Sequence, residues 1–237
     1  MTRRLVSLAV QALGLLLMIS IDGSAQPHDR ARIEKDIEVL REQLKQKELE
    51  FLSPSAEDRA RFAEFLLQRD TGLARLLPRE KYREKLTLRE GGAYYSFTKL
   101  SNSYDRHPQI GLEQEQLSTG FAGADFGFLV SLGDVPLESA GLDHESTQYL
   151  AALVPPTAEP EAREQQRRSG YGFAIGPHRY KGRLPVIVNG TYILRCISYE
   201  DSDVLVAFRV VRQDADGSVI LLWKKLREFS TPYLTRP

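Results

Sequence analysis

The sequence predicts an α+β protein, in which an N-terminal helical arm is followed by a mainly antiparallel β domain. Three observations support this fold class. Apolar side chains recur at helical spacing after Asp29, they alternate with polar ones after Lys85, and Gly, Asn and Asp separate the alternating runs. We therefore assign residues 1–25 to a signal peptide, residues 26–78 to the helical arm and residues 79–237 to the β domain.

The first 25 residues contain the three parts of a secretory signal peptide in order. Arg3 and Arg4 give a positive start, residues 5–21 form an apolar run, and residues 23–25 are small enough for a signal peptidase. The apolar run falls short of the ~20 residues that span a bilayer. We expect cleavage before Gln26, no stable membrane anchor afterwards, and a periplasmic or secreted protein.

Charge and cysteine content exclude several classes of protein. The chain has 32 Lys and Arg against 32 Asp and Glu, whereas nucleic-acid-binding proteins carry a basic excess, so we expect no nucleic acid partner. Cys196 is the single cysteine and cannot form an intrachain disulfide, so an apolar core must stabilise the domain. No His has a second His or Cys at ligand spacing, and the sequence predicts neither a metal site nor a cofactor.

The segment Asp29–Phe51 predicts a long helix with one apolar seam. Its seam residues are separated by four, three, four and seven positions, with Lys47 at the missing one. The run is too short to establish a coiled coil from periodicity alone. Two alternatives remain: the helix mediates homo-oligomerisation or binds a protein partner, or it lies against its own domain. The seam consists of Ile33, Ile37, Leu40, Leu44 and Phe51.

A second, shorter helix is predicted after the Ser53-Pro54 break. Ser55, followed three residues later by Asp58, resembles a helix start, and Asp70 to Gly72 end the segment. We interpret the following leucines as a short apolar link before Pro78. The apolar residues of this helix are Phe62, Phe65 and Leu66, and those of the link are Leu73, Leu76 and Leu77.

The β domain begins with four predicted strands, rich in β-branched, aromatic or alternating residues. Asp143–Val154 then predicts a short helix. Pro155–Ser169 contains two prolines, no aliphatic run and many charges, and we interpret it as a mobile loop. The four strands are Lys85–Arg89, Ala93–Leu100, Ile110–Phe121 and Phe126–Leu132.

Four further strands are predicted at the C-terminus, and the last three read as an antiparallel meander. Asn189-Gly190, between the first two, is a strong hairpin signal. The four runs are Leu184–Val188, Thr191–Tyr199, Val204–Arg212 and Ser218–Phe229.

Alternation in the meander predicts which of its faces is buried. One side is almost free of charge and should form the core, with Cys196 inside it. The opposite side, called the mixed side below, carries both apolar and charged residues. The predicted core residues are Tyr192, Leu194, Cys196, Val204, Val206, Phe208, Val210, Val219, Leu221 and Trp223.

The mixed side carries the candidate ligand-binding residues Arg195, Arg209 and Lys224. A two-residue turn at Asp216-Gly217 would place Arg209 opposite Lys224, and facing like charges favour a bound anion or exposure to water. The two alternatives are therefore an anion-binding strip and a solvated row.

Asp125 is the one acid inside an apolar segment and is the candidate for a perturbed carboxylate. If Asp125 and His144 converge with another polar group in one pocket, an extracytoplasmic hydrolase is indicated. If they are separate, a non-enzymatic binding or assembly protein is favoured. The absence of any catalytic motif makes the non-enzymatic protein our first expectation.

One resemblance adds to this interpretation. The stretches Gly190–Arg195, Asp201–Arg209, Asp216–Ser218 and Leu222–Lys224 together resemble a segment of uncharacterised exported bacterial proteins. The resemblance implies a bacterial, extracytoplasmic setting and brings no activity, ligand or site residue with it.

Overall fold

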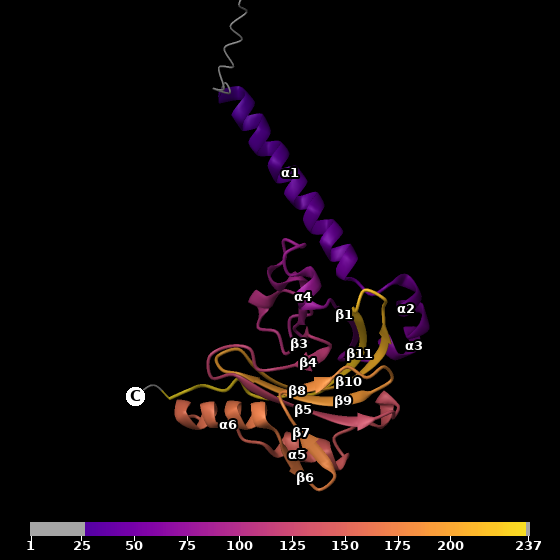
Figure 1. The fold of residues 1–237 in the computed structure, drawn as a ribbon, viewed down its shortest axis with the longest axis vertical. Coiled ribbons are helices and arrows are strands. Elements are labelled where there is room, and N and C mark those ends of the chain that lie inside the picture. The colour runs from indigo at the N-terminus through magenta and orange to yellow at the C-terminus, as the bar shows by residue number, and fades with distance from the viewer. Residues whose placement is uncertain (1–26, 236–237) are drawn as a thin grey trace, which may run out of the picture. The chain divides into compact units, whose positions relative to one another are not determined.

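The computed structural model describes residues 27–235, so the predicted signal peptide and its cleavage site lie outside the described residues. The chain divides into two compact units, Met1–Gln43 and Leu44–Pro237. Helix α1 (Pro27–Leu52) supplies the described part of the first unit and enters the second. Mostly antiparallel sheets follow in the second unit (Figure 1), which confirms the α+β class.

The last turns of α1 belong to the core of the second unit. Glu48 is buried and accepts hydrogen bonds of 2.6 Å from both the backbone N–H and the hydroxyl of Thr87. Leu52 is also buried, and the Phe51 ring lies 5.6 Å from that of Tyr82. The predicted seam therefore has two parts, because Phe51 packs within the second unit whereas Ile33, at the start of the seam, is exposed.

Two short helices, α2 (Ala56–Arg61) and α3 (Ala63–Leu66), come next. The predicted start at Ser55 is confirmed, since Ser55 and Asp58 form a reciprocal capping box that satisfies two free backbone N–H groups. The predicted apolar link is wrong in part, because Thr71–Leu76 forms strand β1. Pairing along β11 stabilises this strand, and the short run alone gave no alternation clear enough to reveal it.

A five-stranded antiparallel sheet forms the centre of the second unit, in the order β1-β11-β10-β9-β5. The predicted C-terminal meander is confirmed as its middle three strands. The bounds are Phe126–Gly133 for β5, Thr191–Ser198 for β9, Ser202–Gln213 for β10 and Val219–Glu228 for β11.

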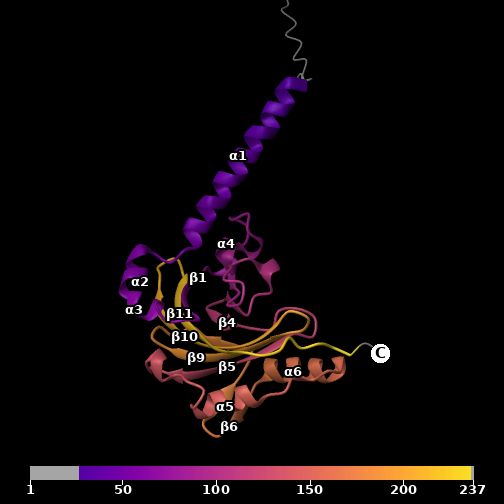
Figure 2. The same cartoon turned by 180° about the vertical axis from the view of Figure 1, so that it is seen from behind.

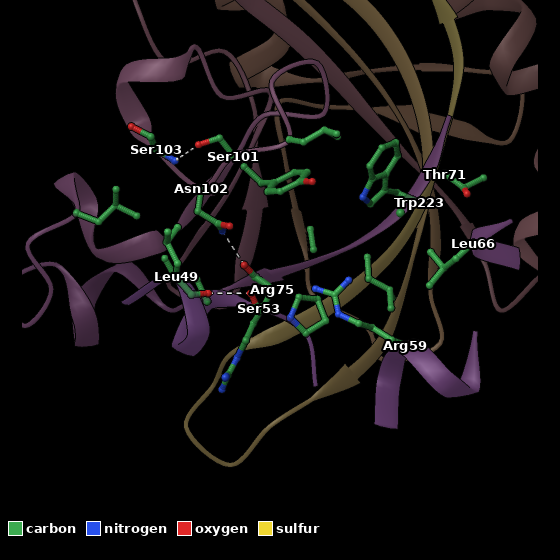
Figure 3. A pocket seen from close by; sticks show the side chains of 18 residues that line it. Leu49, Ser53, Arg59, Leu66, Thr71, Arg75, Ser101, Asn102, Ser103 and Trp223 are labelled. Atoms are coloured by element: carbon green, nitrogen blue, oxygen red, sulfur yellow. Dashed lines mark hydrogen bonds between the residues drawn. The ribbon is translucent and has the colours of Figure 1, made fainter. Parts of the chain in front are cut away.

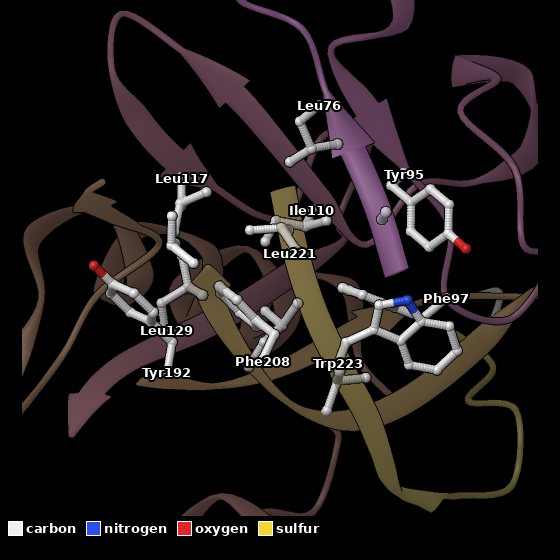
Figure 4. Packing of buried hydrophobic residues seen from close by; sticks show 14 of the residues in the cluster. Leu76, Tyr95, Phe97, Ile110, Leu117, Leu129, Tyr192, Phe208, Leu221 and Trp223 are labelled. Atoms are coloured by element: carbon white, nitrogen blue, oxygen red, sulfur yellow. The ribbon is translucent and has the colours of Figure 1, made fainter. Parts of the chain in front are cut away.

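A second antiparallel sheet, in the order β2-β3-β4-β8, covers one face of the first. All ten predicted core residues of the meander lie in the cluster between these sheets (Figure 4), which confirms the predicted buried face. Tyr95 and Leu117 of the second sheet, and Phe97 shortly after β2, belong to the same core. Its strands are β2 (Tyr94–Tyr95), β3 (Ile110–Glu113), β4 (Gln116–Ser118) and β8 (Arg183–Pro185).

Short helices connect β1 to the second sheet. The predicted strand Lys85–Arg89 is wrong, because the chain there makes turns that lead into η1 (Arg89–Gly92). Glu90 and Gly91 adopt left-handed φ values of 61° and 62°, which a strand does not allow. Helix α4 (Arg79–Tyr82) precedes η1 in this connection, whereas η2 (Tyr104–Arg106) lies between β2 and β3.

Helices and a hairpin cover the opposite face of the central sheet, as both views show (Figure 2). The predicted helix at 143–154 is confirmed as α5 (Glu145–Ala152). Around it lie η3 (Leu137–Ser139), α6 (Glu159–Tyr171), and the hairpin of β6 (Phe173–Ile175) and β7 (His178–Tyr180).

The mobile loop predicted near 155–169 is wrong, because this stretch contains helix α6. Its Glu, Ala, Arg and Gln residues have high helix propensity, and Pro160 lies in the first turn, where a proline is tolerated. Ala162 and Ser169 are buried, and the Ser169 hydroxyl donates to the carbonyl of Gly127 at 2.5 Å. The prediction gave weight to the missing aliphatic residues, but these two small buried side chains are enough to pack α6 against its own domain.

Two details of the predicted pairing are also corrected. Asn189-Gly190 does not close a hairpin, because β8 pairs with β4 while β9 pairs with β5 and β10. A register shift between Val210 and Arg212 aligns Arg209 with Leu222, so Arg209 does not face Lys224. Two changes add up to this offset: five residues, 214–218, separate β10 from β11 where a two-residue turn was predicted, and the bulge in β10 shifts the pairing by one more residue.

Candidate functional site

The three predicted ligand-binding residues do not form one strip. Arg195 is 1 % exposed and pairs with Asp203, also 1 % exposed, through hydrogen bonds of 2.9 and 2.7 Å. A third N–H group donates to the carbonyl of Leu150, and the Phe229 ring lies 3.7 Å from the guanidinium carbon. Three of the five N–H groups of the Arg195 guanidinium thus have partners inside the protein.

Arg209 and Lys224 lie on the same face as Arg195, and they contact the segment before η3 and η3 itself, respectively. Arg209 donates to the carbonyl of Val135 at 2.6 Å and to Asp134 at 2.6 Å. Lys224 donates to the carbonyl of Glu138 at 3.1 Å. All three predicted residues therefore serve as internal links.

Asp125 and His144 do not share a pocket. Asp125 accepts a 2.9 Å hydrogen bond from the backbone N–H of Tyr199 and lines a small cavity beside His107. Burial raises the pKa of Asp125, although the hydrogen bond from Tyr199 opposes the shift. His144 caps α5 through Ser146, and its ring lies 5.8 Å from that of His178. The condition set for a hydrolase site is not met.

A larger cavity, of about 520 Å³, lies elsewhere in the second unit (Figure 3). It is framed by the end of α1, by α2 and α3, by β1, and by the segment 100–103. Apolar side chains form much of its wall, and its lining includes no Asp or Glu. The volume falls within the range of small-molecule sites, which is roughly 300–1,000 Å³.

Trp223 supplies a buried hydrogen-bond donor to this cavity. The side chain is 3 % exposed, and its Nε1 has no hydrogen-bond partner. The Tyr95 hydroxyl is close by without meeting the geometry of a hydrogen bond. Figure 3 shows the nitrogen on the side of the indole that faces the other lining residues. Because a buried unpaired donor costs about 1–3 kcal/mol, this N–H suggests a missing acceptor.

Gly72 explains how the indole reaches this position. Gly72 is directly opposite Trp223 in the β1–β11 pairing, and a Cβ there would lie 2.6 Å from Cζ2 and 3.0 Å from Nε1. Any larger residue would displace the ring. The glycine thus allows the edge of Trp223 to border the cavity.

Arg59 supplies an unpaired positive charge. Its guanidinium is exposed and forms no ion pair within residues 27–235, and Figure 3 shows it extending from α2 into the pocket. The neighbouring Asp58 fixes α2 by an ion pair with Arg212. Burial favours a raised Asp58 pKa, but hydrogen bonds from Ser55 and Arg212 outweigh burial and lower it. The charged Asp58 therefore anchors the helix that carries Arg59.

The remaining polar groups are neutral or already engaged. Burial raises the pKa of Tyr95 to about 12, so its phenol stays an O–H donor at neutral pH. Arg75 is held by Ser218 at 3.0 Å and by Asp216 at 3.5 Å. Asn102 donates to the carbonyl of Arg75 at 2.7 Å. Trp223 Nε1 and the Arg59 guanidinium are thus two donors of this lining with capacity for a ligand, and the Tyr95 hydroxyl is a third.

Sequence reasoning placed Trp223 correctly in the core but did not connect it with Arg59. These residues are far apart in sequence, and the turn from α3 into β1 brings them together. The signal that could have suggested the site is Gly72 within an apolar run, since a glycine in a strand often marks a close approach.

No protein-family model, curated protein or solved structure matches this chain. Among residues 27–235, no group of three or more His, Cys, Asp or Glu side chains is placed to bind a metal ion. Within the same described range, no helix has both the length and the apolar character needed to cross a membrane.

Proposed function

We propose that this protein is a non-enzymatic binding protein that works outside the cytoplasm and binds a small ligand in the cavity beside Trp223. The observation that carries the proposal is the unpartnered Trp223 Nε1 in an apolar cavity bordered by the free Arg59 guanidinium. A buried donor without a partner is costly, and a ligand oxygen would remove that cost.

The donors define the chemistry of the ligand. An apolar body suits the wall formed by Leu52, Leu66 and Leu73, and an anionic group suits Arg59. With no acid in the lining, nothing there repels a carboxylate, and guanidinium–carboxylate hydrogen bonds are among the stronger ones. The ligand class is an aliphatic or aromatic molecule with one carboxylate.

The absence of candidate catalytic groups from the cavity lining supports a binding role. The cavity lining of the described chain has no carboxylate, His or Cys that could act as base or nucleophile. The hydrolase alternative rests on Asp125, whose carboxylate instead holds the turn between β9 and β10 through the Tyr199 N–H. Binding without reaction is the simpler role for this donor set.

The site of action follows from the predicted signal peptide and from the resemblance to exported bacterial proteins. We expect the exported chain to begin at Gln26. Intact-mass spectrometry of the protein recovered outside the cytoplasm tests this, and a mass that includes residues 1–25 would contradict it.

Trp223 is the single tryptophan of the chain, so its fluorescence reports directly on the cavity. We propose titration with octanoate and with octan-1-ol, which share the apolar chain and differ in charge. Octanoate should shift the emission at roughly tenfold lower concentration, because Arg59 adds a charged hydrogen bond of about 1.4 kcal/mol.

Two matched variants test the residue assignment. Arg59→Gln should remove most of the preference for octanoate, whereas Arg61→Gln, on the same helix but outside the cavity lining, should leave it unchanged. If neither probe shifts the emission, or if both variants bind alike, the cavity is not the proposed site.

A further inference from the structure

We infer that the cavity beside Trp223 binds the C-terminal tail of a partner protein, whose main chain pairs with the open edge of strand β1. This inference rests on the proposed binding function and names the ligand. Three features of the described chain carry it: the unpaired backbone groups of β1, the position of the cavity around the edge of the sheet, and the charge of its lining.

Strand β1 lies at one edge of the central sheet, with β11 as its neighbour. The N–H of Lys225 donates to the carbonyl of Asp70 at 2.7 Å, and residues along an antiparallel pair alternate between bonding the neighbouring strand and pointing away from it. Thr71 and Leu73 therefore direct their backbone N–H and C=O groups away from β11. Within residues 27–235, no other segment forms a hydrogen bond with these four groups. Such an unpaired row is a template for a further strand.

The protein completes the rest of this edge itself. The Asn102 side chain donates to the carbonyl of Arg75 at 2.7 Å, and the Leu77 N–H donates to the carbonyl of Gly92 at 3.2 Å. The open stretch is thus residues 71–73. A strand that pairs there cannot continue past Asn102, so the ligand presents the end of a chain to the cavity.

The cavity surrounds the open edge instead of lying on one face of the sheet. Its lining includes Leu66 and Leu73, which pack with the cluster on the α5 side, and Tyr95 and Trp223, which belong to the core between the two sheets. Figure 3 shows Trp223 and Leu66 beside the segment that carries Thr71. Successive side chains of an added strand point to opposite faces, so one would meet the leucines and the next would meet the aromatic rings. Pockets for alternate side chains are how edge-pairing sites select a peptide.

The open edge also distinguishes a peptide from a simple apolar acid. The carbonyl of Leu73 is an acceptor, and an ionised aliphatic acid has no donor to offer it. A peptide strand carries N–H and C=O groups in the same alternation as the edge, and their hydrogen bonds supply affinity when a strand is added. The main chain of a peptide therefore satisfies groups that octanoate leaves unpaired.

The charge of the lining selects the carboxyl end of a longer chain. Arg59 suits a terminal carboxylate, together with the O–H of Tyr95 and the Nε1–H of Trp223. Among the described lining residues there is no Asp or Glu to receive a terminal ammonium. A free short peptide would bring that ammonium without a partner, whereas the tail of a protein brings its carboxylate alone. The occupant is therefore a protein tail that ends in apolar residues.

Isothermal titration calorimetry of the exported chain with synthetic peptides tests this inference. Acetyl-trileucine with a free carboxylate represents the tail of a longer protein. It should bind roughly tenfold more tightly than octanoate, because main-chain hydrogen bonds are added to the same apolar and charged contacts. Its C-terminal amide should bind roughly tenfold more weakly than the acid. Trileucine with a free amine should also bind more weakly than the acetylated acid.

N-methylation of acetyl-trileucine, one amide at a time, decides whether its main chain pairs with β1. Each methyl group removes one N–H donor and keeps the apolar side chains and the carboxylate. Neighbouring amides of a strand point in opposite directions, so binding should weaken roughly tenfold at amides that face β1 and stay unchanged at those between them. Arg59→Gln should remove the preference for the acid over the amide, and Arg61→Gln is the matched control that should keep it.

The outcomes separate this inference from the proposed function. If acetyl-trileucine binds no more tightly than octanoate, or if methylation has the same effect at every amide, edge pairing is overturned and binding of an apolar acid stands. Tighter binding of the free amine overturns the assignment to a protein tail. If neither octanoate nor the peptide binds, the proposed function fails and this inference fails with it.

Discussion

The two faces of the central sheet bury comparable numbers of side chains but in different ways. The face toward the second sheet holds an almost uncharged cluster that includes Phe208 and Trp223. The face toward α5 holds Arg195 and Asp203, a fully buried ion pair. The first face is stabilised by close packing and by the burial of apolar area. The second face is stable only while both charges of its buried ion pair are present. The comparison predicts that different kinds of substitution destabilise the two faces.

The largest effect is expected from Phe208→Asp, on the apolar face. Phe208 is completely buried and stacks on Tyr192, with ring centroids 5.2 Å apart. An unpaired charge there costs several kcal/mol, enough to unfold a domain of ordinary stability. Circular dichroism should show loss of fold, whereas Phe208→Leu should stay folded. A folded Phe208→Asp protein would refute the assignment of this face.

On the charged face, Arg195→Met should lower the free energy of unfolding by about 3–5 kcal/mol, because it leaves Asp203 buried without its partner. The double variant Arg195→Met, Asp203→Leu should recover much of this loss, since a well-packed apolar pair of similar volume is often neutral. Urea unfolding of both proteins tests the comparison. Equal stability of the single and double variants would show that the ion pair is not the determining feature.

The same variant should depend on pH in a defined direction. Burial raises the pKa of Asp203 in the folded wild type, and Arg195 opposes that shift. Without Arg195 the folded pKa rises further, so the folded state binds a proton more tightly than the unfolded chain does, and lower pH favours folding. The loss caused by Arg195→Met should therefore shrink as the pH falls toward ~3.9, the ordinary Asp value. A loss independent of pH would contradict this.

A smaller effect is expected at the rim of the charged face. Arg209→Glu removes hydrogen bonds to Val135 and Asp134 and should cost about 1 kcal/mol, since Asp134 is exposed to water. No relief of repulsion with Lys224 is expected, because Arg209 aligns with Leu222. Arg209→Gln is the milder control. A gain in stability on Arg209→Glu would indicate that Arg209 and Lys224 do repel each other.

The least perturbing test leaves the sequence unchanged. Cys196 lies in the apolar cluster, and burial raises its pKa to about 12, so the reactive thiolate is scarce in the folded protein. A thiol reagent should modify it only after unfolding, at a rate that follows added denaturant. Rapid labelling of the native protein would mean that the apolar face opens on its own.

Local patterns were enough for much of the fold. Alternation identified the apolar core face of β9, β10 and β11 in full, although the opposite face is buried as well. The Ser55 start of α2 was correct because a capping box is formed by neighbours in sequence. Helix α6 was missed although its residues favour helix, since the absence of aliphatic side chains was given more weight than propensity. Strand β1 was missed because its partner β11 lies far along the chain.

For the candidate sites, the sequence alone determined the residue types and the face of the sheet on which they lie, but not their interaction partners. It placed Arg195, Arg209 and Lys224 on one side of the meander, and only the tertiary structure gave them Asp203, Val135 and Glu138 as partners. Arg59, Gly72 and Trp223 likewise became one cavity wall through folding. The physical reason is that side-chain periodicity is a local property of the chain. Whether a charge or a hydrogen-bond donor has a partner depends instead on contacts between segments that are distant in sequence.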